Sequence, residues 1–348
     1  MSVAELDKGG TAEEIIRSYF LDMSAYVVRG IKLQYKDFEV TDVDIWVYLR
    51  PSPFQRSRFN IDIKNKKTPQ AAERIFWAKG LQSILGLDDC IVATTDKRQH
   101  IKEFGRMYGV TVFDGNFLES IKEKYTTEIT RLSEEEFSNL IHPQKDDKSR
   151  SEWLQKITIS KSRLLSKLDF DGCNSWLIDC GFFLEKYRTT NNEAAEISCR
   201  CLYLVISYFL VGLDFTSQRF ILENSKSRES ILEEGFKYGD LGVSRYDKTI
   251  HLVASLTKAL IGKDASSEKM IKNTLDSSLD NLPIAILSQY FTNAENLKEL
   301  FNAAKKFEQM AYSKKFSPPS ALENKEMAIL GIILDYYKIE RKKFFSNI

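Results

Sequence analysis

The pattern of hydrophobic and polar positions changes its period several times within the first 120 residues, which is typical of helices and strands that alternate in one folded unit. From Thr11 to Phe20, apolar side chains recur at helical spacing and predict a helix. β-Branched and aromatic runs follow at 26–33, 38–49 and 59–63, separated by Gly30 and by a Pro-Ser-Pro turn at 51–53. These runs predict three strands that form a meander.

The next segments predict a helix, a strand, a helix and a strand. The first of these helices covers 69–85, with Pro69 at the first helical position, where its missing N–H is not needed. A buried strand at 90–95, a helix at 97–108 and a short strand at 110–113 complete the unit. From Phe117 onward strand patterns nearly vanish, and Ser133 followed by three glutamates predicts a helix start.

The second half of the chain predicts helices only. A polar, proline-marked stretch at 142–150 is the expected linker. Helical patterns follow at 152–168, 174–187, 192–212, 216–236, 244–261, 267–279, 283–290, 294–312 and 319–344. We therefore expect an α/β domain at 1–120, a helical connection at 121–150, and an all-α domain at 151–348.

Composition excludes several classes of protein. The 348 residues are 43% hydrophobic, and 50 Lys and Arg balance 49 Asp and Glu, so there is no overall basic field. The longest apolar run, Cys201 to Leu213, is shorter than the roughly 18 residues that span a bilayer. The N-terminus lacks the pattern of a secretory signal, so we expect a cytoplasmic protein without membrane contact. The five cysteines match no disulfide or zinc pattern and are interpreted as reduced core residues.

Three charged side chains stand out because of where the strand pattern places them. Asp44 lies where the second strand begins, and Asp62 and Lys64 lie two residues apart on the third strand, hence on one face. The flanking Ile61 and Ile63 then point to the opposite face. If the two strands form an antiparallel hairpin, Asp44 comes beside Asp62, and two neighbouring carboxylates repel each other unless a cation lies between them. Mg²⁺ is usually held by one or two carboxylates together with phosphate oxygens and water.

The order of elements, with Asp44 followed 18 residues later by Asp62-x-Lys64, resembles the PD-(D/E)xK nuclease superfamily. The resemblance covers about residues 11–117, and its later strands and helix are similar to those of Mrr-like and Holliday-resolvase-like members. It implies a restriction-endonuclease-like mixed β-sheet flanked by helices, here followed by an all-α domain. It also implies that Asp44 and Asp62 hold the metal and that Lys64 orients or activates the attacking water. The acidic residue of the first helix falls on Glu13 or Glu14, of which Glu14 is preferred.

The same resemblance implies Mg²⁺ or Mn²⁺ as cofactor, with the backbone carbonyl of Ile63 as a further ligand. Val40 and Thr41 stand where the family has its motif proline, a departure that leaves the metal ligands in place. A bare D-x-K tripeptide is common, and the alternative interpretation is a solvated hairpin whose charges form weak surface ion pairs. The expected burial of a central strand favours the nuclease interpretation.

Local charge agrees with a polyanionic partner. Between Arg29 and Lys79 there are 11 Lys and Arg against 6 Asp and Glu. The cations expected to meet backbone phosphates are Arg56, Arg58, Lys66, Lys67, Arg74 and Lys79. For each of them, a solvated surface position is an equally good interpretation.

The expected function is that of a metal-dependent endonuclease acting on DNA, most simply double-stranded. The pairing with a helical domain suggests a role in restriction or anti-phage defence, with the helical domain positioning substrate, mediating dimerisation or regulating the nuclease. A double-strand cut by one-site enzymes needs two active sites, which makes a homodimer a reasonable expectation. No phosphate-binding glycine motif occurs, so any ATPase would be a separate subunit. The alternatives are an inactive nuclease fold that acts as a binding module, and an RNA-directed nuclease or an exonuclease.

Overall fold

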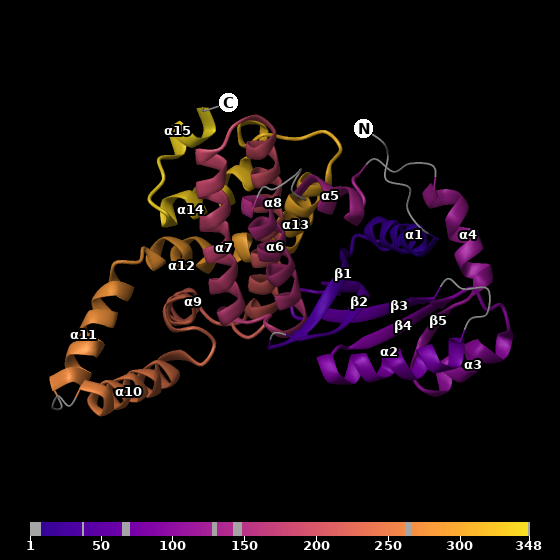
Figure 1. Ribbon diagram of the computed structural model, residues 1–348, viewed down its shortest axis with the longest axis horizontal. Coiled ribbons are helices and arrows are strands. Elements are labelled where there is room, and N and C mark those ends of the chain that lie inside the picture. Colours follow the sequence, from indigo (N-terminus) through magenta and orange to yellow (C-terminus); the bar gives the residue numbers. More distant parts are fainter. Residues whose placement is uncertain are drawn as a thin grey trace.

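The computed structural model describes residues 8–36, 38–64, 70–126, 131–141, 148–261 and 266–346. The N-terminal third is an α/β unit and the rest is helical (Figure 1). The elements of the α/β unit are α1 (Lys8–Asp22), β1 (Tyr26–Tyr35), β2 (Phe38–Leu49), β3 (Ser57–Lys64), α2 (Ala71–Leu85), β4 (Asp89–Thr94), α3 (Gln99–Met107), β5 (Thr111–Phe113) and α4 (Gly115–Thr126).

The five strands form one mixed sheet in the order β1-β2-β3-β4-β5. Strands β1, β2 and β3 are consecutive and antiparallel, so the predicted meander is confirmed. Strands β3, β4 and β5 are parallel neighbours. Parallel neighbours need a crossover connection, and α2 and α3 provide the two crossovers.

Helices cover both faces of this sheet. On one face, Ile16 and Phe20 of α1 join Ile61 of β3 in a core that α4 closes. On the other face, Ile75 of α2 joins Val92 of β4 and residues of α3. Figure 1 shows α1 and α4 on one side of the sheet and α2 and α3 on the other. Each face therefore buries its alternate side chains, as the strand period requires.

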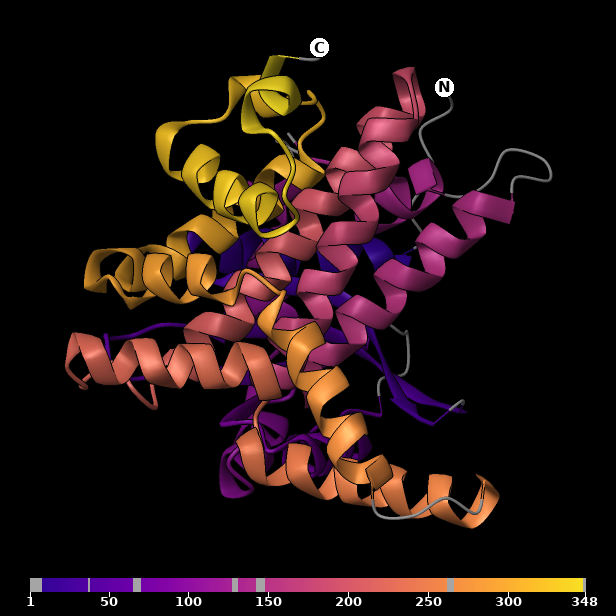
Figure 2. The same cartoon turned by 90° about the vertical axis from the view of Figure 1, so that its left-hand side faces the viewer.

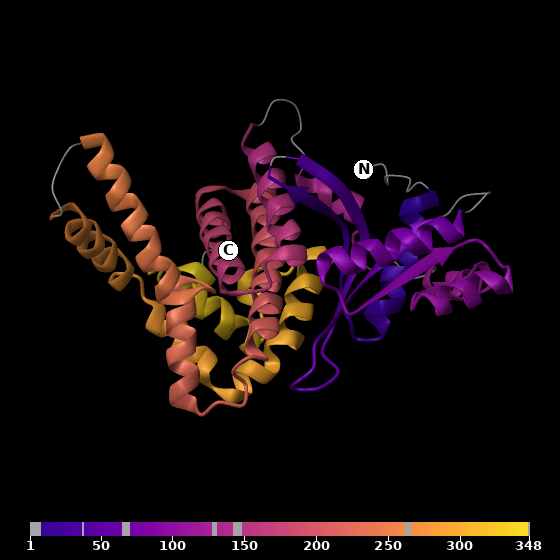
Figure 3. The same ribbon diagram turned by 90° about the horizontal axis from the view of Figure 1, so that it is seen from below.

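The helical part comprises the remaining elements, which are α5 (Glu134–Ile141), α6 (Lys148–Ser166), α7 (Phe170–Thr189), α8 (Asn192–Ser217), α9 (Ser225–Tyr238), α10 (Gly242–Ile261), α11 (Ser266–Asp280), α12 (Ile284–Thr292), α13 (Ala294–Tyr312), η1 (Pro319–Ala321), α14 (Asn324–Tyr336) and α15 (Arg341–Ser346). Its core is continuous with the β1–β2 end of the sheet, because Trp46 and Tyr48 belong to the same apolar cluster as residues of α7, α8 and α13. In Figure 2 these helices lie in front of the sheet. Figure 3 shows α10 and α11 extending away from it at the far end of the molecule.

Helix α8 is the centre of the helical core. Among the described residues it is the one helix long and apolar enough to cross a membrane, and 83% of its most apolar window is buried inside the protein. The predicted interpretation of its apolar run as a buried helix is confirmed. All five cysteines are free and buried, which confirms their assignment to the core.

Most predicted helices lie within a few residues of the observed ones, with two exceptions. The helix expected at 216–236 is wrong at its start, because α8 continues to Ser217 and the Asn224 side chain caps a new helix by accepting the N–H of Ser227. The helix expected at 319–344 is broken after α14, where Lys338 has the left-handed φ of 53°. The helix start at Ser133 is confirmed by reciprocal hydrogen bonds with Glu136. Most of the predicted linker, 142–147, lies outside the described residues, and Lys148 already belongs to α6.

Candidate metal and nucleic-acid site

The candidate site lies where β2 and β3 end their pairing. The antiparallel register of these strands ends at Ile45 opposite Ile61, and continuing it by one residue sets Asp44 opposite Asp62. The Asp44 carboxylate accepts a hydrogen bond from the backbone N–H of Ile63, with Oδ2 2.6 Å from the nitrogen. This side-chain hydrogen bond therefore replaces the next backbone hydrogen bond between the two strands and holds Asp44 against β3. Asp44 lies in the middle of β2 and not, as expected from the sequence, at its start, and the structure sets it beside Asp62 near the end of β3.

Asp62 faces helix α2. Its side chain is 4% exposed, and its Oδ2 atom lies 2.6 Å from Nε of Arg74, while its second oxygen contacts another nitrogen of the same guanidinium. Ile61 and Ile63 pack on the opposite face beside α1, so the predicted division of β3 into a charged and an apolar face is confirmed. The guanidinium of Arg74 is thus the cation that balances Asp62 in this structure.

The environment of Asp44 favours its neutral form. Burial raises the pKa of Asp44, and repulsion from Asp42 acts in the same direction. The hydrogen bond from Ile63 lowers this pKa, as do the positive charges of Arg74 and Lys64, without cancelling the effect of burial. Lys64, which is half-buried at the end of β3, is therefore close enough for its charge to act on Asp44.

The acidic side chain of α1 whose pKa responds to the charge of Asp44 is Glu13. Burial is the largest cause that raises the pKa of Glu13 to about 6, and the charges of Asp44 and Glu135 raise it further. Arg29 opposes this shift, since its terminal nitrogen lies 2.6 Å from Oε2 of Glu13. Arg29 also contacts Glu135 of α5 at 3.0 Å, so a residue of the helical part helps to fix the geometry of this side chain.

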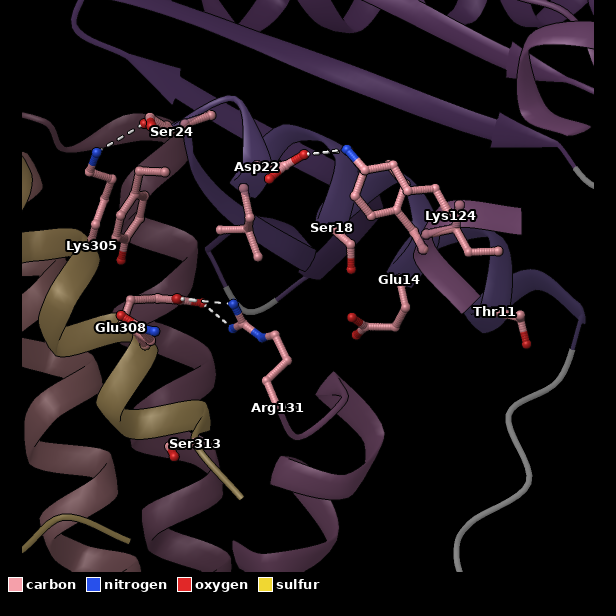
Figure 4. A pocket seen from close by; sticks show the side chains of 16 residues that line it. Thr11, Glu14, Ser18, Asp22, Ser24, Lys124, Arg131, Lys305, Glu308 and Ser313 are labelled. Atoms are coloured by element: carbon pink, nitrogen blue, oxygen red, sulfur yellow. Dashed lines mark hydrogen bonds and ion pairs between the residues drawn. The ribbon is translucent and has the colours of Figure 1, made fainter. Parts of the chain in front are cut away.

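Glu14, the residue preferred from the sequence, binds the same guanidinium of Arg29 as Glu13 but has different further partners. It is buried against Arg17 and Arg29, and although burial alone would raise its pKa, these two arginines lower it below the ordinary value. Figure 4 shows Glu14 in a pocket near the ion pair of Arg131 with Glu308. The pocket has a volume of about 830 Å³, and Asp44 is not among the described residues that line it. A carboxylate that already has two guanidinium partners is a poor ligand for a further cation.

The predicted phosphate-binding cations differ in accessibility. Arg56 is buried, pairs with Asp214 of α8 at 2.7 Å and donates to the carbonyl oxygens of Ser52 and Pro53. The prediction that Arg56 binds a backbone phosphate is therefore wrong, because its guanidinium is buried and pairs with Asp214 between the sheet and the helical part. Arg58 is also engaged, since it lies 4.5 Å from the centre of the Phe215 ring and donates to a backbone carbonyl.

Of the remaining predicted cations, Arg74 is the one that contacts a residue of the candidate site. Arg74 is bound to Asp62, as described above, and Lys79 is half-buried five residues, or about 1.4 helical turns, farther along α2. Lys66 and Lys67 lie outside the described residues.

The donor set is compatible with one hard divalent ion. Within the described residues, no group of three or more His, Cys, Asp or Glu side chains is close enough to hold a metal. Mg²⁺ nevertheless needs only one or two protein carboxylates when substrate phosphate and water complete its shell. The pKa values of Asp44 and Glu13 are raised by burial and by repulsion from neighbouring carboxylates, and a bound cation would relieve that repulsion. Asp44, Asp62 and the carbonyl of Ile63 therefore fit such an ion once Arg74 has released Asp62.

Sequence reasoning missed the parts played by Arg29, Glu135 and Arg74. One signal was present, because Arg29 interrupts an apolar strand, and a charged side chain in a buried strand needs charged partners. Nothing local identified those partners, since Glu135 is 106 residues away in the chain.

Comparisons with protein-family models, with curated proteins and with solved structures found no match to this chain. Functional inference therefore depends on the geometry of the site.

Proposed function

We propose that the chain is a metal-dependent endonuclease that hydrolyses phosphodiester bonds of DNA. The observation that carries this proposal is the placement of Asp44 and Asp62 next to each other where the pairing of β2 with β3 ends, with the charge of Lys64 acting on Asp44. The observed order of helices and strands in the α/β unit agrees with a PD-(D/E)xK fold.

In this proposal Asp44, Asp62 and the carbonyl oxygen of Ile63 hold Mg²⁺ or Mn²⁺, and Glu13 replaces Glu14 as the acidic side chain from α1. When bound, the ion would supply positive charge beside the scissile phosphate. Lys64 adds a fixed positive charge that orients the attacking water and stabilises the charge that develops on the phosphate oxygens.

Arg74 has two successive roles in this scheme. It neutralises Asp62 in the structure described here and occupies both oxygens of its carboxylate. It has to give up at least one of these contacts before a cation can bind there. The released guanidinium would then lie beside the substrate, where planar bidentate binding of a phosphate is favourable.

The test is incubation of supercoiled plasmid with the purified protein and Mg²⁺ or Mn²⁺, with an RNA transcript as a second substrate. We expect nicked or linear DNA, and we expect Asp62→Asn and Lys64→Ala each to lower the rate by about 100-fold or more. Matched controls are Asp89→Asn, at the exposed start of β4, and Lys97→Ala, an exposed residue paired with Glu119. Cleavage that persists in both site variants would overturn the residue assignment.

The ion pair between Arg74 and Asp62 also favours a second candidate, a nuclease fold that acts only as a binding module. In such a protein Arg74 is a permanent counterion and no metal binds. The two candidates differ in one measurement. A metal site should stabilise the folded state by about 1–3 kcal/mol at saturating Mn²⁺, because only the folded state binds the ion, whereas a binding module should show no change in its thermal unfolding.

A further inference from the structure

Helices α2 and α3 expose large apolar side chains on the surface that faces away from the sheet. Phe76 is 56% exposed, Trp77 is 44% exposed, and Met107 and Tyr108 at the end of α3 are also exposed. We call these four residues the aromatic surface. The Phe76 and Tyr108 rings lie 5.6 Å apart and both contact the half-buried Phe104, which connects the two helices.

The aromatic surface adjoins the candidate site through Arg74. The guanidinium carbon of Arg74 lies 5.7 Å from the centre of the Trp77 ring, and the same guanidinium binds Asp62. One arginine therefore separates the exposed indole from the carboxylate proposed to hold the metal. A base stacked on Trp77 would therefore lie next to the guanidinium that covers Asp62.

The two helices that carry the aromatic surface also carry cations. Together α2 and α3 carry four Lys or Arg and two Glu. The ammonium of Lys79 reaches the turn at Gly109 next to Tyr108, and Arg106 is exposed on α3. Among the described residues, neither Lys79 nor Arg106 forms an ion pair with a carboxylate. Lysine is depleted at the centre of protein–protein interfaces, whereas aromatic side chains, methionine and arginine are enriched there, so Lys79 is the residue that favours a ligand presenting both flat rings and negative charges.

We propose that the aromatic surface binds unpaired bases of the DNA substrate, so that the candidate site acts on single-stranded stretches or on junctions that contain them. The faces of bases in an intact duplex are covered by their stacked neighbours, whereas unpaired bases stack on exposed aromatic side chains. Lys79 and Arg106 then meet the adjoining phosphates. This substrate preference rests on the proposed nuclease function, but the binding step does not need a metal.

Tryptophan fluorescence reports on this surface selectively. The chain has four tryptophans, and Trp46, Trp153 and Trp176 are each at most 2% exposed. Quenching on addition of DNA therefore comes from Trp77. The experiment titrates the full-length protein in EDTA with a mixed-sequence DNA strand of about 16 nucleotides, and separately with its blunt duplex.

We expect quenching by the single strand at low micromolar concentration and a several-fold weaker response to the duplex. Trp77→Ala should raise the Kd for the single strand about 5- to 150-fold, the loss of one base–aromatic stack, measured by anisotropy of a labelled strand. Trp77→Phe should restore most of the affinity. The control is Leu222→Ala, which removes an exposed apolar side chain in the helical part and should leave Kd unchanged.

Absence of quenching, or equal affinity of wild-type protein and Trp77→Ala for the single strand, would overturn the proposal and favour a protein partner for this surface. Equal affinity for duplex and single strand would overturn it as well. Because the measurement is made without divalent ions, its outcome is separate from that of the cleavage assay. Metal-dependent cleavage without quenching would contradict this inference alone, and quenching without cleavage would contradict the nuclease proposal alone.

Discussion

The buried ion pair between the sheet and the helical core gives the sharpest prediction about stability. Asp214 lies on α8 with no exposed surface, and its carboxylate lies 2.7 Å from Nε of Arg56 and 3.0 Å from a terminal nitrogen of Arg50. It also accepts a hydrogen bond from the Tyr48 hydroxyl, at 2.5 Å. Burial raises the pKa of Asp214 even though two arginines oppose this effect, so desolvation offsets much of the attraction between the charges.

We predict that Asp214→Asn lowers the free energy of unfolding by about 3–5 kcal/mol. The substitution leaves the side-chain shape unchanged but removes the only negative charge that Arg56 contacts among the described residues. The buried guanidinium then has no counterion, and its desolvation is no longer offset. Such a loss is a large fraction of the roughly 5–15 kcal/mol that stabilises a typical protein.

The assay is unfolding in urea, followed by far-ultraviolet circular dichroism. The matched control is Asp335→Asn, which breaks a partly exposed pair between the end of α14 and Arg341 of α15 and should cost at most about 1 kcal/mol. The double variant with Arg56→Gln should regain part of the stability lost in Asp214→Asn, because it removes the unpaired charge. A loss no larger than that of the exposed control would refute this reasoning.

Two further predictions concern packing and pH. Gly212→Ala on α8 should lower the free energy of unfolding in urea by about 1–3 kcal/mol, because the new β-carbon would lie 2.4 Å from the Trp176 ring. Gly80→Ala on α2 has open space around the new β-carbon and should raise this free energy by about 0.5–1 kcal/mol. Equal effects of the two substitutions would contradict this account of their surroundings. Because the pKa of Glu13 is about 6 in the folded protein, against 4.5 for an isolated glutamate, the metal-free protein should lose up to about 2 kcal/mol as the pH rises through this range. Mn²⁺ should compete with the proton on Glu13, so the affinity for Mn²⁺, measured by titration calorimetry, should increase as the pH rises past about 6. If Glu13→Gln left this pH dependence unchanged, Glu13 would not be the group responsible.

Much of the α/β unit could be predicted from local pattern. Strand alternation repeats every two residues, so Asp62 and Lys64 had to share a face, and the structure places Ile61 and Ile63 on the other one. Turn residues between the runs located the meander, and burial is the usual state of free cysteines. These features are determined by residues that are close to one another in the sequence, so they can be predicted from a single sequence.

The choice among charged side chains was decided by tertiary structure. Glu13 and Glu14 differ by one position, about 100° around the helix, and their roles depend on where Arg29 and Asp44 lie when the sheet has formed. From the sequence, Arg56 is expected to be a surface cation. The fold instead places it beside Asp214, which is 158 residues away in the chain.

The sequence by itself determined the order of helices and strands, the faces of β3 and the identity of the polar residues at its end. Only the tertiary structure decided which of those charges are buried, which are paired and which remain open to a substrate. The physical reason is that the energy of a charge depends on its desolvation and on the distance to every other charge, and both are properties of the assembled chain.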